Sequence, residues 1–330
     1  MTTVAAVDCG TNSLRLLISS VVSLDEDEVR LVDVERRMEV VRLGQGVDRT
    51  GAFTPEALER TFEALREYAE LMASHGVTMG PDSVRMVATS ATRDVANRDE
   101  FVDGVRSIIG VTPEVITGDE EAELSFVGAT AELEGAEDDG FRRPFLVVDI
   151  GGGSTEFVLG HTEDDGAGLV RAARSVDIGC VRMTERHLTT DPPTKQQVAA
   201  ATADIDAALD EVCATVPLSE AATVVCVAGT ATTVAGIHLD LAEYVPERIH
   251  HTRVPSGRVR EITDDLLEMS HEQRAAIGVM HPGRVDVIAA GSLVLDRVLA
   301  RTGAAEFVAS EHDILDGLAW SVCLGDAPAS

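Results

Sequence analysis

The chain has 330 residues, 45% hydrophobic and 25% charged, with a formal net charge of -30 at pH 7. These values are ordinary for a globular protein long enough for two domains, and the negative charge argues against nonspecific nucleic-acid binding. No apolar run approaches a membrane span, and the five cysteines contain no CxxC pair, so neither a disulfide framework nor a zinc site is indicated. Because a strand follows the first residues directly, without a signal-peptide core, we expect a cytoplasmic protein with no membrane partner.

Strands and helices alternate along the first part of the chain. We predict strands at 3–8, 14–22, 28–41, 83–88 and 115–116. A helix is predicted to begin around Pro55, which suits a first helical position, and to bury Leu58, Phe62 and Leu65 at helical spacing. Further helices are predicted at 98–109 and 119–131, the latter opened by acidic residues as the helix dipole favours. An acidic, glycine-containing surface loop is expected at 134–140.

The second part continues the alternation. Two strands of a hairpin begin at Phe145 and after Thr155, and further strands are predicted at 223–227 and 306–309. Helices are predicted at 194–213, 286–301 and 314–324. Strands that alternate with helices throughout indicate an α/β protein.

One pattern occurs twice and suggests where function resides. An apolar run, an Asp, then glycine with hydroxyl residues and a second apolar run are found around Asp8 and again around Asp149. Glycine lets backbone amides approach an anion, and hydroxyls add donors. We expect phosphate oxygens to be held by Asn12, Ser13, Gly151, Gly152, Gly153 and Ser154. The pattern therefore predicts two related lobes that face one phosphate-bearing substrate.

A third turn, Ala228 to Thr233, leads from a strand into a helix. Gly229 and Thr230 would hold a further phosphate at the helix N-terminus. The chain contains no GxxxxGK[ST] loop and no GxGxxG fingerprint, so neither a P-loop nor a Rossmann dinucleotide site is indicated.

Five motifs follow in an order that resembles the exopolyphosphatase/guanosine pentaphosphate phosphatase family. They are Asp8-x-Gly-Thr-Asn-Ser, Thr89-Ser-Ala-Thr-Arg93, Gly118-Asp-Glu-Glu-Ala122, Asp149-x-Gly-Gly-Gly-Ser-Thr-Glu156 and Ala228-Gly-Thr230. The resemblance runs from Val4 to the final helix and fits the short, two-domain form of the family. It implies two ribonuclease-H-like lobes of the actin-like ATPase superfamily, at 1–125 completed by 314–330 and at 126–313, with the active site in the cleft between them.

The resemblance also implies a reaction, a metal and residue roles. The reaction is hydrolysis of the terminal phosphate of polyphosphate, with help from Mg2+ or another divalent metal such as Mn2+. Glu121 matches the catalytic glutamate, which can deprotonate the attacking water. The alternative interpretation of Glu121 is acidity at a helix N-terminus, which explains Glu120 equally well. Arg93 matches a phosphate-binding arginine. Arg15, on the second strand of the hairpin, either faces the cleft or is solvated.

Three acids are candidates for the metal site. They are Asp8, Asp149 and Glu156, and Mg2+ commonly takes only one or two carboxylates, so not all need be ligands. The alternative interpretation is turn capping for the two Asp residues and an outward, solvated position for Glu156.

Other activities remain open from the sequence. Hydrolysis of guanosine pentaphosphate to tetraphosphate needs a base pocket, and an aromatic content of 3% offers few stacking platforms. A kinase, an actin-like ATPase, or a non-catalytic sensor of polyphosphate or nucleotide are further alternatives, and a homodimer is possible. Six basic residues between Arg248 and Arg260 either line a path for long polyphosphate or form a solvated basic loop that pairs with acidic surface.

Overall fold

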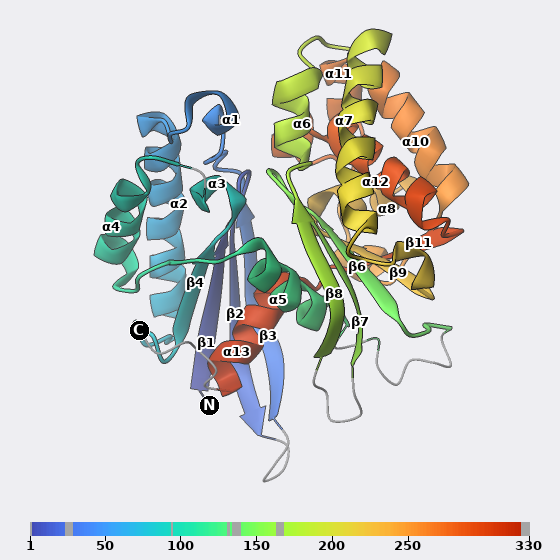
Figure 1. Ribbon diagram of the computed structural model, residues 1–330. Helices are drawn as coiled ribbons and strands as arrows, with labels where there is room; N and C mark the ends of the chain where they lie inside the picture. Colours follow the sequence, from blue (N-terminus) through green and yellow to red (C-terminus); the bar gives the residue numbers. More distant parts are fainter. Residues whose placement is uncertain are drawn as a thin grey trace. The chain divides into compact units, whose positions relative to one another are not determined.

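The computed structural model describes residues 2–23, 29–93, 95–130, 133, 140–162 and 168–324. The chain divides into two compact units, Met1–Leu124 with Ile314–Ser330, and Ser125–Asp313. Both units are α/β, as predicted (Figure 1). Apart from Gly140, the acidic loop predicted at 134–140 lies outside the described residues. None of the described helices is both long and apolar enough to cross a membrane.

The first unit is built on a five-stranded sheet with the order β3-β2-β1-β4-β5. Strands β1 and β3 each pair with β2 antiparallel, whereas β4 runs parallel to β1 and β5 runs parallel to β4. The strands are β1 (Thr2–Cys9), β2 (Leu14–Ser23), β3 (Val29–Glu39), β4 (Val84–Ala88) and β5 (Glu114–Val115).

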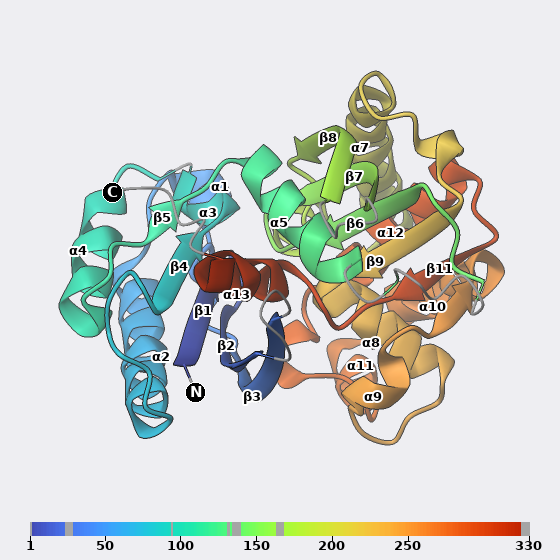
Figure 2. The same cartoon turned by 90° about the horizontal axis from the view of Figure 1, so that it is seen from below.

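Helices cover both faces of this sheet (Figures 1 and 2). Helices α2 (Pro55–Ser74) and α4 (Arg98–Ile109) pack on the face that carries Ala5 and Val7 of β1. Helix α13 (Ile314–Leu324) packs on the face that carries Ala6. Because side chains alternate along a strand, Asp8 belongs to the α13 face. The short helices α1 (Val47–Thr50) and α3 (Ser90–Arg93) follow strand ends, and α5 (Gly118–Thr130) contains the boundary between the units.

The second unit has a six-stranded sheet with the order β10-β11-β9-β6-β7-β8. Strands β6, β7 and β8 form an antiparallel meander, and β9 and β11 continue the sheet parallel to β6. The strands are β6 (Phe145–Ile150), β7 (Thr155–Thr162), β8 (Gly168–Val176), β9 (Thr223–Val227), β10 (Arg253–Pro255) and β11 (Glu306–Ala309).

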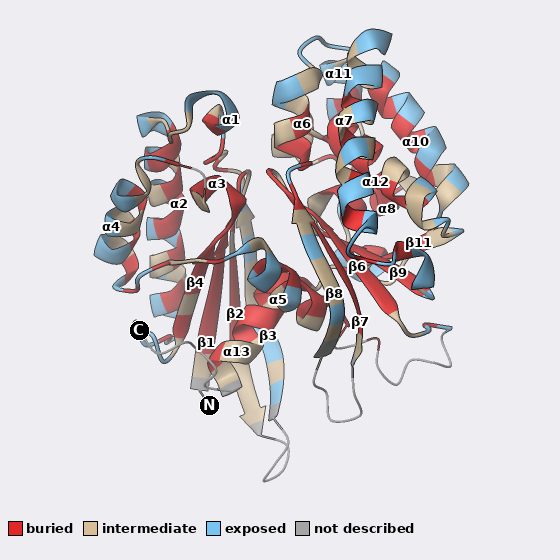
Figure 3. Ribbon diagram, in the orientation of Figure 1, coloured by how far each residue is buried: buried red, intermediate tan, exposed pale blue. Residues whose placement is uncertain are grey.

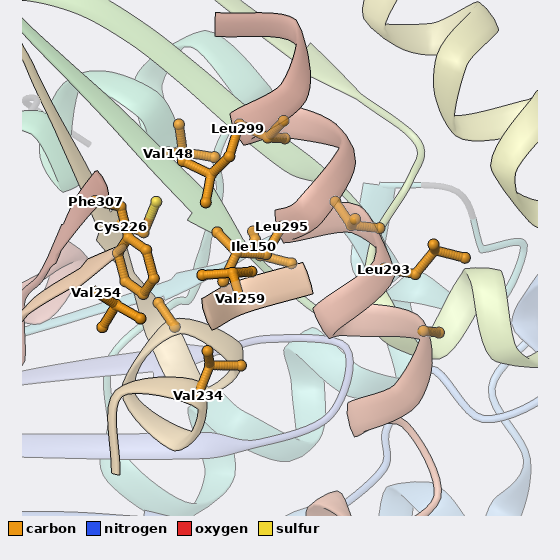
Figure 4. Packing of buried hydrophobic residues seen from close by; sticks show 14 of the residues in the cluster. Val148, Ile150, Cys226, Val234, Val254, Val259, Leu293, Leu295, Leu299 and Phe307 are labelled. Atoms are coloured by element: carbon orange, nitrogen blue, oxygen red, sulfur yellow. The ribbon is translucent and has the colours of Figure 1, made fainter. Parts of the chain in front are cut away.

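One face of the second sheet carries the larger hydrophobic core. Val148, Ile150 and Cys226 pack there against Val234, Val259 and Leu295 from three helices (Figure 4). The helices of this unit are α6 (Cys180–His187), α7 (Lys195–Cys213), α8 (Ala228–His238), α9 (Pro246–Ile249), α10 (Ser256–Glu268), α11 (His271–Ala275) and α12 (Ile288–Thr302). Alternation along β6 puts Asp149 on the opposite face, where Ser125 of α5 contacts it.

Burial differs sharply between central and edge strands (Figure 3). Every residue of β6 is buried, whereas Val32 and Val34 of the edge strand β3 are exposed. Asp8 and Asp149 are nevertheless buried near the ends of the central strands β1 and β6. A buried carboxylate is costly unless it is paired or hydrogen-bonded, so these two positions require specific partners.

Gly317 of α13 tests how closely the helices of the first unit pack. A Cβ at this position would lie 2.3 Å from the carbonyl oxygen of Leu124 in α5. We expect Gly317→Ala to lower the free energy of unfolding by about 1–3 kcal/mol, because a backbone atom would have to move. Urea unfolding followed by circular dichroism measures this difference.

The matched control is Gly257→Ala in α10, where an added Cβ would meet nothing within 4 Å. Alanine is a better helix former than glycine, so this variant should unfold at the wild-type urea concentration or higher. Equal stability of Gly317→Ala and wild type would contradict the close packing of α13 on α5.

Candidate functional site

The first hairpin joins Asp8 to Arg15. The register of β1 and β2 places the two residues directly opposite each other. The Nε and Nη2 atoms of Arg15 donate to Oδ2 of Asp8 at 2.9 and 2.7 Å, and Asp8 is only 3% exposed. The Asp8 carboxylate is therefore neutralised within its own hairpin, and Arg15 is neither an isolated cation nor a solvated edge residue.

The second hairpin has the same register but a different partner. Asp149 of β6 lies directly opposite Glu156 of β7. Side chains at such positions have Cβ atoms about 4.5–5.5 Å apart, and like charges there are destabilising. Glu156 is 1% exposed, so the alternative of an outward, solvated side chain is wrong. Two buried carboxylates opposite each other require a compensating positive charge or hydrogen-bond donors.

This carboxylate pair fits a divalent cation. Mg2+ prefers oxygen ligands and usually takes one or two carboxylates together with water. Within the described part of the chain, no group of three or more His, Cys, Asp or Glu side chains is placed to hold a metal ion. The structure thus brings together two of the three predicted metal-site acids, Asp149 and Glu156, while Asp8 lies in the other unit with Arg15.

Two serine hydroxyls that the sequence did not single out contact this pair. Ser125 Oγ of α5 donates to Asp149 Oδ2 at 2.8 Å, and Ser175 Oγ of β8 donates to Glu156 Oε1 at 2.7 Å. Neither serine belongs to a recognisable motif, and only the fold brings them to the carboxylates.

The glycine loop of the first hairpin is held by its carbonyl groups. Gly44 N donates to Thr11 O and Arg42 N donates to Asn12 O, each at 2.8 Å, and Gly10 N closes the turn on Ser13 O at 2.9 Å. The backbone amides of residues 11–13 donate to none of the described residues. These amides are therefore available to an anion, as expected for a phosphate loop.

The second glycine loop is built in the same way, with helix α6 as its support. The first amides of α6 donate to the loop carbonyls, Cys180 N to Gly151 O at 2.9 Å and Val181 N to Gly152 O at 2.8 Å. A Cβ on Gly179 would lie 2.3 Å from the carbonyl carbon of Gly152, so only glycine permits this approach. As in the first loop, no described residue accepts a hydrogen bond from the amides of residues 152–154.

A further residue that the sequence did not single out holds this second loop. Arg182 Nε donates to Gly153 O at 2.8 Å, and the backbone amide of Arg182 donates to Gly152 O. The loop carbonyls are thus bound on the α6 side. This arrangement fixes the loop without using the amides that would bind phosphate.

The two adjacent glutamates at the start of α5 have different environments. Oε2 of Glu120 accepts hydrogen bonds from the amide and hydroxyl of Thr117 at 2.8 and 2.9 Å, and these bonds lower the pKa of Glu120. Glu121 is instead 8% exposed, and its Oε2 accepts from Arg93 Nη1 at 2.9 Å. Glu120 therefore caps the helix, whereas Glu121 does not take part in that cap.

Arg93 is anchored at two points. Its Nη1 donates to the Ile116 carbonyl at 3.1 Å as well as to Glu121. Guanidinium has five N–H donors, so these contacts leave donors for a phosphate. The predicted catalytic and phosphate-binding residues of the first unit are thus in direct contact.

The N-terminus of α8 carries the third predicted phosphate turn. Ala228 adopts a left-handed backbone with φ of 64°, and no side chain caps the helix. Arg284 Nη1 donates to Gly229 O at 3.0 Å and to Thr233 Oγ1 at 3.2 Å, and a Cβ on Gly229 would overlap the Arg284 guanidinium. Thr230 is buried beside Gly229. The sequence assigned no site role to Arg284, which adds a positive charge to this helix start.

Burial controls the titratable groups around this turn. It raises the pKa of the Cys180 thiol to about 11, so this cysteine is a thiol at neutral pH. Burial, followed by the charge of Arg284, lowers the pKa of His281, whose Nδ1 accepts from Gly283 N at 3.1 Å. Of Cys180, His281 and Arg284, it is therefore Arg284 that supplies positive charge at the start of α8.

The basic segment from Arg248 to Arg260 comprises the end of α9, a turn at 250–252, strand β10 and the start of α10. Three arginines of this segment each pair with an acid: Arg253 with Glu306, Arg258 with Glu261 and Arg260 with Asp296. Their charges are balanced locally, which agrees with the alternative of pairing to acidic surface.

This chain is similar to known proteins over most of its length. The model of the Ppx/GppA phosphatase family matches residues 20–319. The chain is 48% identical to a protein named Exopolyphosphatase 2 from Mycobacterium tuberculosis, over 98% of this chain and 99% of that protein.

Solved structures are similar along the whole chain. A crystal structure of an exopolyphosphatase-like protein, 43% identical, covers 99% of this chain and 100% of its own with a TM-score of 0.89. A crystal structure of the Ppx/GppA family member from Aquifex aeolicus, 28% identical, covers 99% of each chain with a TM-score of 0.76. These similarities confirm the predicted fold class. With a family match over most of its length, this chain belongs to the Ppx/GppA phosphatase family.

Proposed function

We propose that this protein is a divalent-metal-dependent exopolyphosphatase, which hydrolyses the terminal phosphate of inorganic polyphosphate and releases orthophosphate. The observation that carries the proposal is the second hairpin, where available loop amides adjoin the buried pair of Asp149 and Glu156. A phosphate cradle beside a cation site is what cleavage of a phosphoric anhydride requires. The relative named Exopolyphosphatase 2 supports this choice of substrate.

The glycine loops would bind the anionic oxygens of the substrate. Their amides point from a backbone that is already held by other hydrogen bonds, so binding requires little reorganisation. Phosphoryl transfer depends mainly on positioning and on stabilisation of charge, which fixed donors of this kind provide. Asn12, Ser13, Gly229 and Thr230 remain predicted contacts of the same kind.

Glu121 is the proposed general base. Its carboxylate would accept a proton from the attacking water, while the oxygen of the water bonds to the terminal phosphorus. The bond from that phosphorus to the bridging oxygen breaks, and the shortened chain leaves with the bridging oxygen. Arg93 would hold the Glu121 carboxylate through Nη1 and contact a phosphate with its other donors.

Asp149 and Glu156 are the proposed ligands of Mg2+ or Mn2+. When bound, the cation would neutralise charge on the phosphate oxygens. Asp8 was a third candidate ligand, but both Nε and Nη2 of Arg15 donate to one of its oxygens. We therefore propose that Asp8 orients Arg15.

Substitution of the two neighbouring glutamates tests the base. Glu121→Ala should lower the rate of phosphate release from polyphosphate by about 10²–10⁴-fold, the usual contribution of a general base. Glu120→Ala is the matched control, because it removes a carboxylate from the same helix start and should lose some stability but retain activity. Release of orthophosphate is measured with short and long polyphosphate and with guanosine pentaphosphate.

Full activity of Glu121→Ala would contradict the assigned base. Cleavage of guanosine pentaphosphate in preference to both polyphosphates would replace the proposed substrate with the alternative one. Polyphosphate binding by the wild type without phosphate release in Mg2+ would indicate a sensor.

Charge reversal at Glu156 tests the cation site. Glu156→Arg would give the second hairpin the Asp–Arg pairing of the first. We expect this variant to lose Mn2+ binding and to form an ion pair between Asp149 and the new arginine. Glu156→Gln, which preserves the shape of the side chain, should also weaken Mn2+ binding. Isothermal titration with Mn2+ measures affinity, and thermal unfolding in EDTA measures stability.

Phosphate release should fall in both variants and in wild-type protein treated with EDTA. Undiminished Mn2+ affinity in folded Glu156→Gln protein would exclude Glu156 as a ligand.

A further inference from the structure

The carboxylate pair of the second unit is part of a longer row of polar groups. The register of β6, β7 and β8 places Asp149 opposite Glu156 and Glu156 opposite Ser175. Residues directly opposite each other project to the same face of a sheet. Ser125, from α5, contacts Asp149, so the order along the row is Ser125, Asp149, Glu156, Ser175.

Three of the four members of the row are almost completely removed from solvent, and Ser175 is partly exposed. Ser125 is 0% exposed, Glu156 is 1% exposed and Asp149 is 6% exposed. In such surroundings a hydrogen bond to a charged group is stronger than in water, and it fixes the geometry of both partners. A serine hydroxyl carries one proton, and here each proton goes to a carboxylate oxygen.

Each hydroxyl engages one particular oxygen. Ser125 contacts Oδ2 of Asp149, and Ser175 contacts Oε1 of Glu156. Each contact restrains the rotation of its carboxylate plane. A carboxylate binds a cation well only when its oxygens are correctly oriented. Loss of a hydrogen bond from a neighbouring residue to a metal ligand commonly lowers metal affinity by about 10–100-fold.

We propose that Ser125 and Ser175 are positioning residues that orient Asp149 and Glu156 for a divalent cation. The proposal rests on the proposed function, since it deepens the same cation site. The competing interpretation is that the serines only satisfy buried carboxylates. In that case their removal would lower stability without a specific effect on cation affinity.

Variants of nearly equal shape separate the two interpretations. Ser175→Thr keeps the hydroxyl, and Ser175→Val has the shape of threonine without the hydroxyl. Both are β-branched residues, which suit a position on a β-strand. Ser125→Ala removes the other hydroxyl with little change in volume. Ser292→Ala is the control, because Ser292 is equally buried in the same unit but donates to the Ala289 carbonyl of its own helix.

The measurement is Mn2+ affinity of the full chain without substrate, by isothermal titration, together with thermal unfolding in EDTA. We expect Ser125→Ala and Ser175→Val each to bind Mn2+ about 10-fold or more weakly, while Ser175→Thr and Ser292→Ala bind like wild type. At saturating Mg2+ the first two variants should recover most of their phosphate release.

Two results would overturn the inference in different ways. Wild-type Mn2+ affinity in both hydroxyl-free variants, with weaker binding in Glu156→Gln, would show that the cation site exists and that the serines do not position it. Wild-type affinity in Glu156→Gln and in Asp149→Asn would instead overturn the proposed cation site itself.

Discussion

The register of two β-hairpins decides which charges meet in this protein. In each hairpin, an Asp near the end of a central strand lies directly opposite a residue of the next strand. A slip of one residue would move Asp149 to the face where Val148 and Ile150 pack against helices, and it would separate the Asp from its partner. The glycine loops between the strands set this register and also present the amides. Charge placement and the proposed phosphate binding therefore depend on the same short turns.

One residue makes the two hairpins chemically different. Arg15 balances Asp8 within the first hairpin, whereas the second hairpin has a second carboxyl group, that of Glu156, opposite its Asp. The backbone arrangement is shared, so the difference lies in the side chain opposite the Asp. A repeat that looks symmetrical in sequence thus gives one hairpin with an ion pair and one with two carboxyl groups opposite each other.

Much of the fold could be predicted from the sequence, because its central strands are short apolar runs with clear ends. Strands β9 and β11 and helix α4 have the predicted bounds. Strand β8 was not predicted because this edge strand has Arg171 and Arg174 among small residues and no long apolar run. Helix α10 was not predicted, although Val259, Ile262 and Leu266 have helical spacing, because no side chain caps its start and arginines flank its first apolar residue.

The candidate site was predictable where its chemistry is unusual. Asp8 and Asp149 each stand between an apolar run and a glycine-containing turn, and this repetition made them predictable from the sequence. Ser125 and Ser175 could not be identified, because their importance arises from contacts with residues more than fifteen positions away that only the fold brings together. The separation of Glu120 from Glu121 likewise required the hydrogen bonds around Thr117.

With a cation at the proposed site, the two hairpins would also differ in thermodynamic linkage. Unfolding separates Asp149 from Glu156 and relieves their repulsion, so a cation bound between them would favour the folded state alone. At a free concentration 100 times its Kd, such a ligand adds about 2.7 kcal/mol to the free energy of unfolding. Residues Ser125–Asp313 would then become more resistant to heat as Mg2+ rises, while the Asp8–Arg15 hairpin would not respond. Mg2+ at the proposed site would in this way influence how long the folded protein survives.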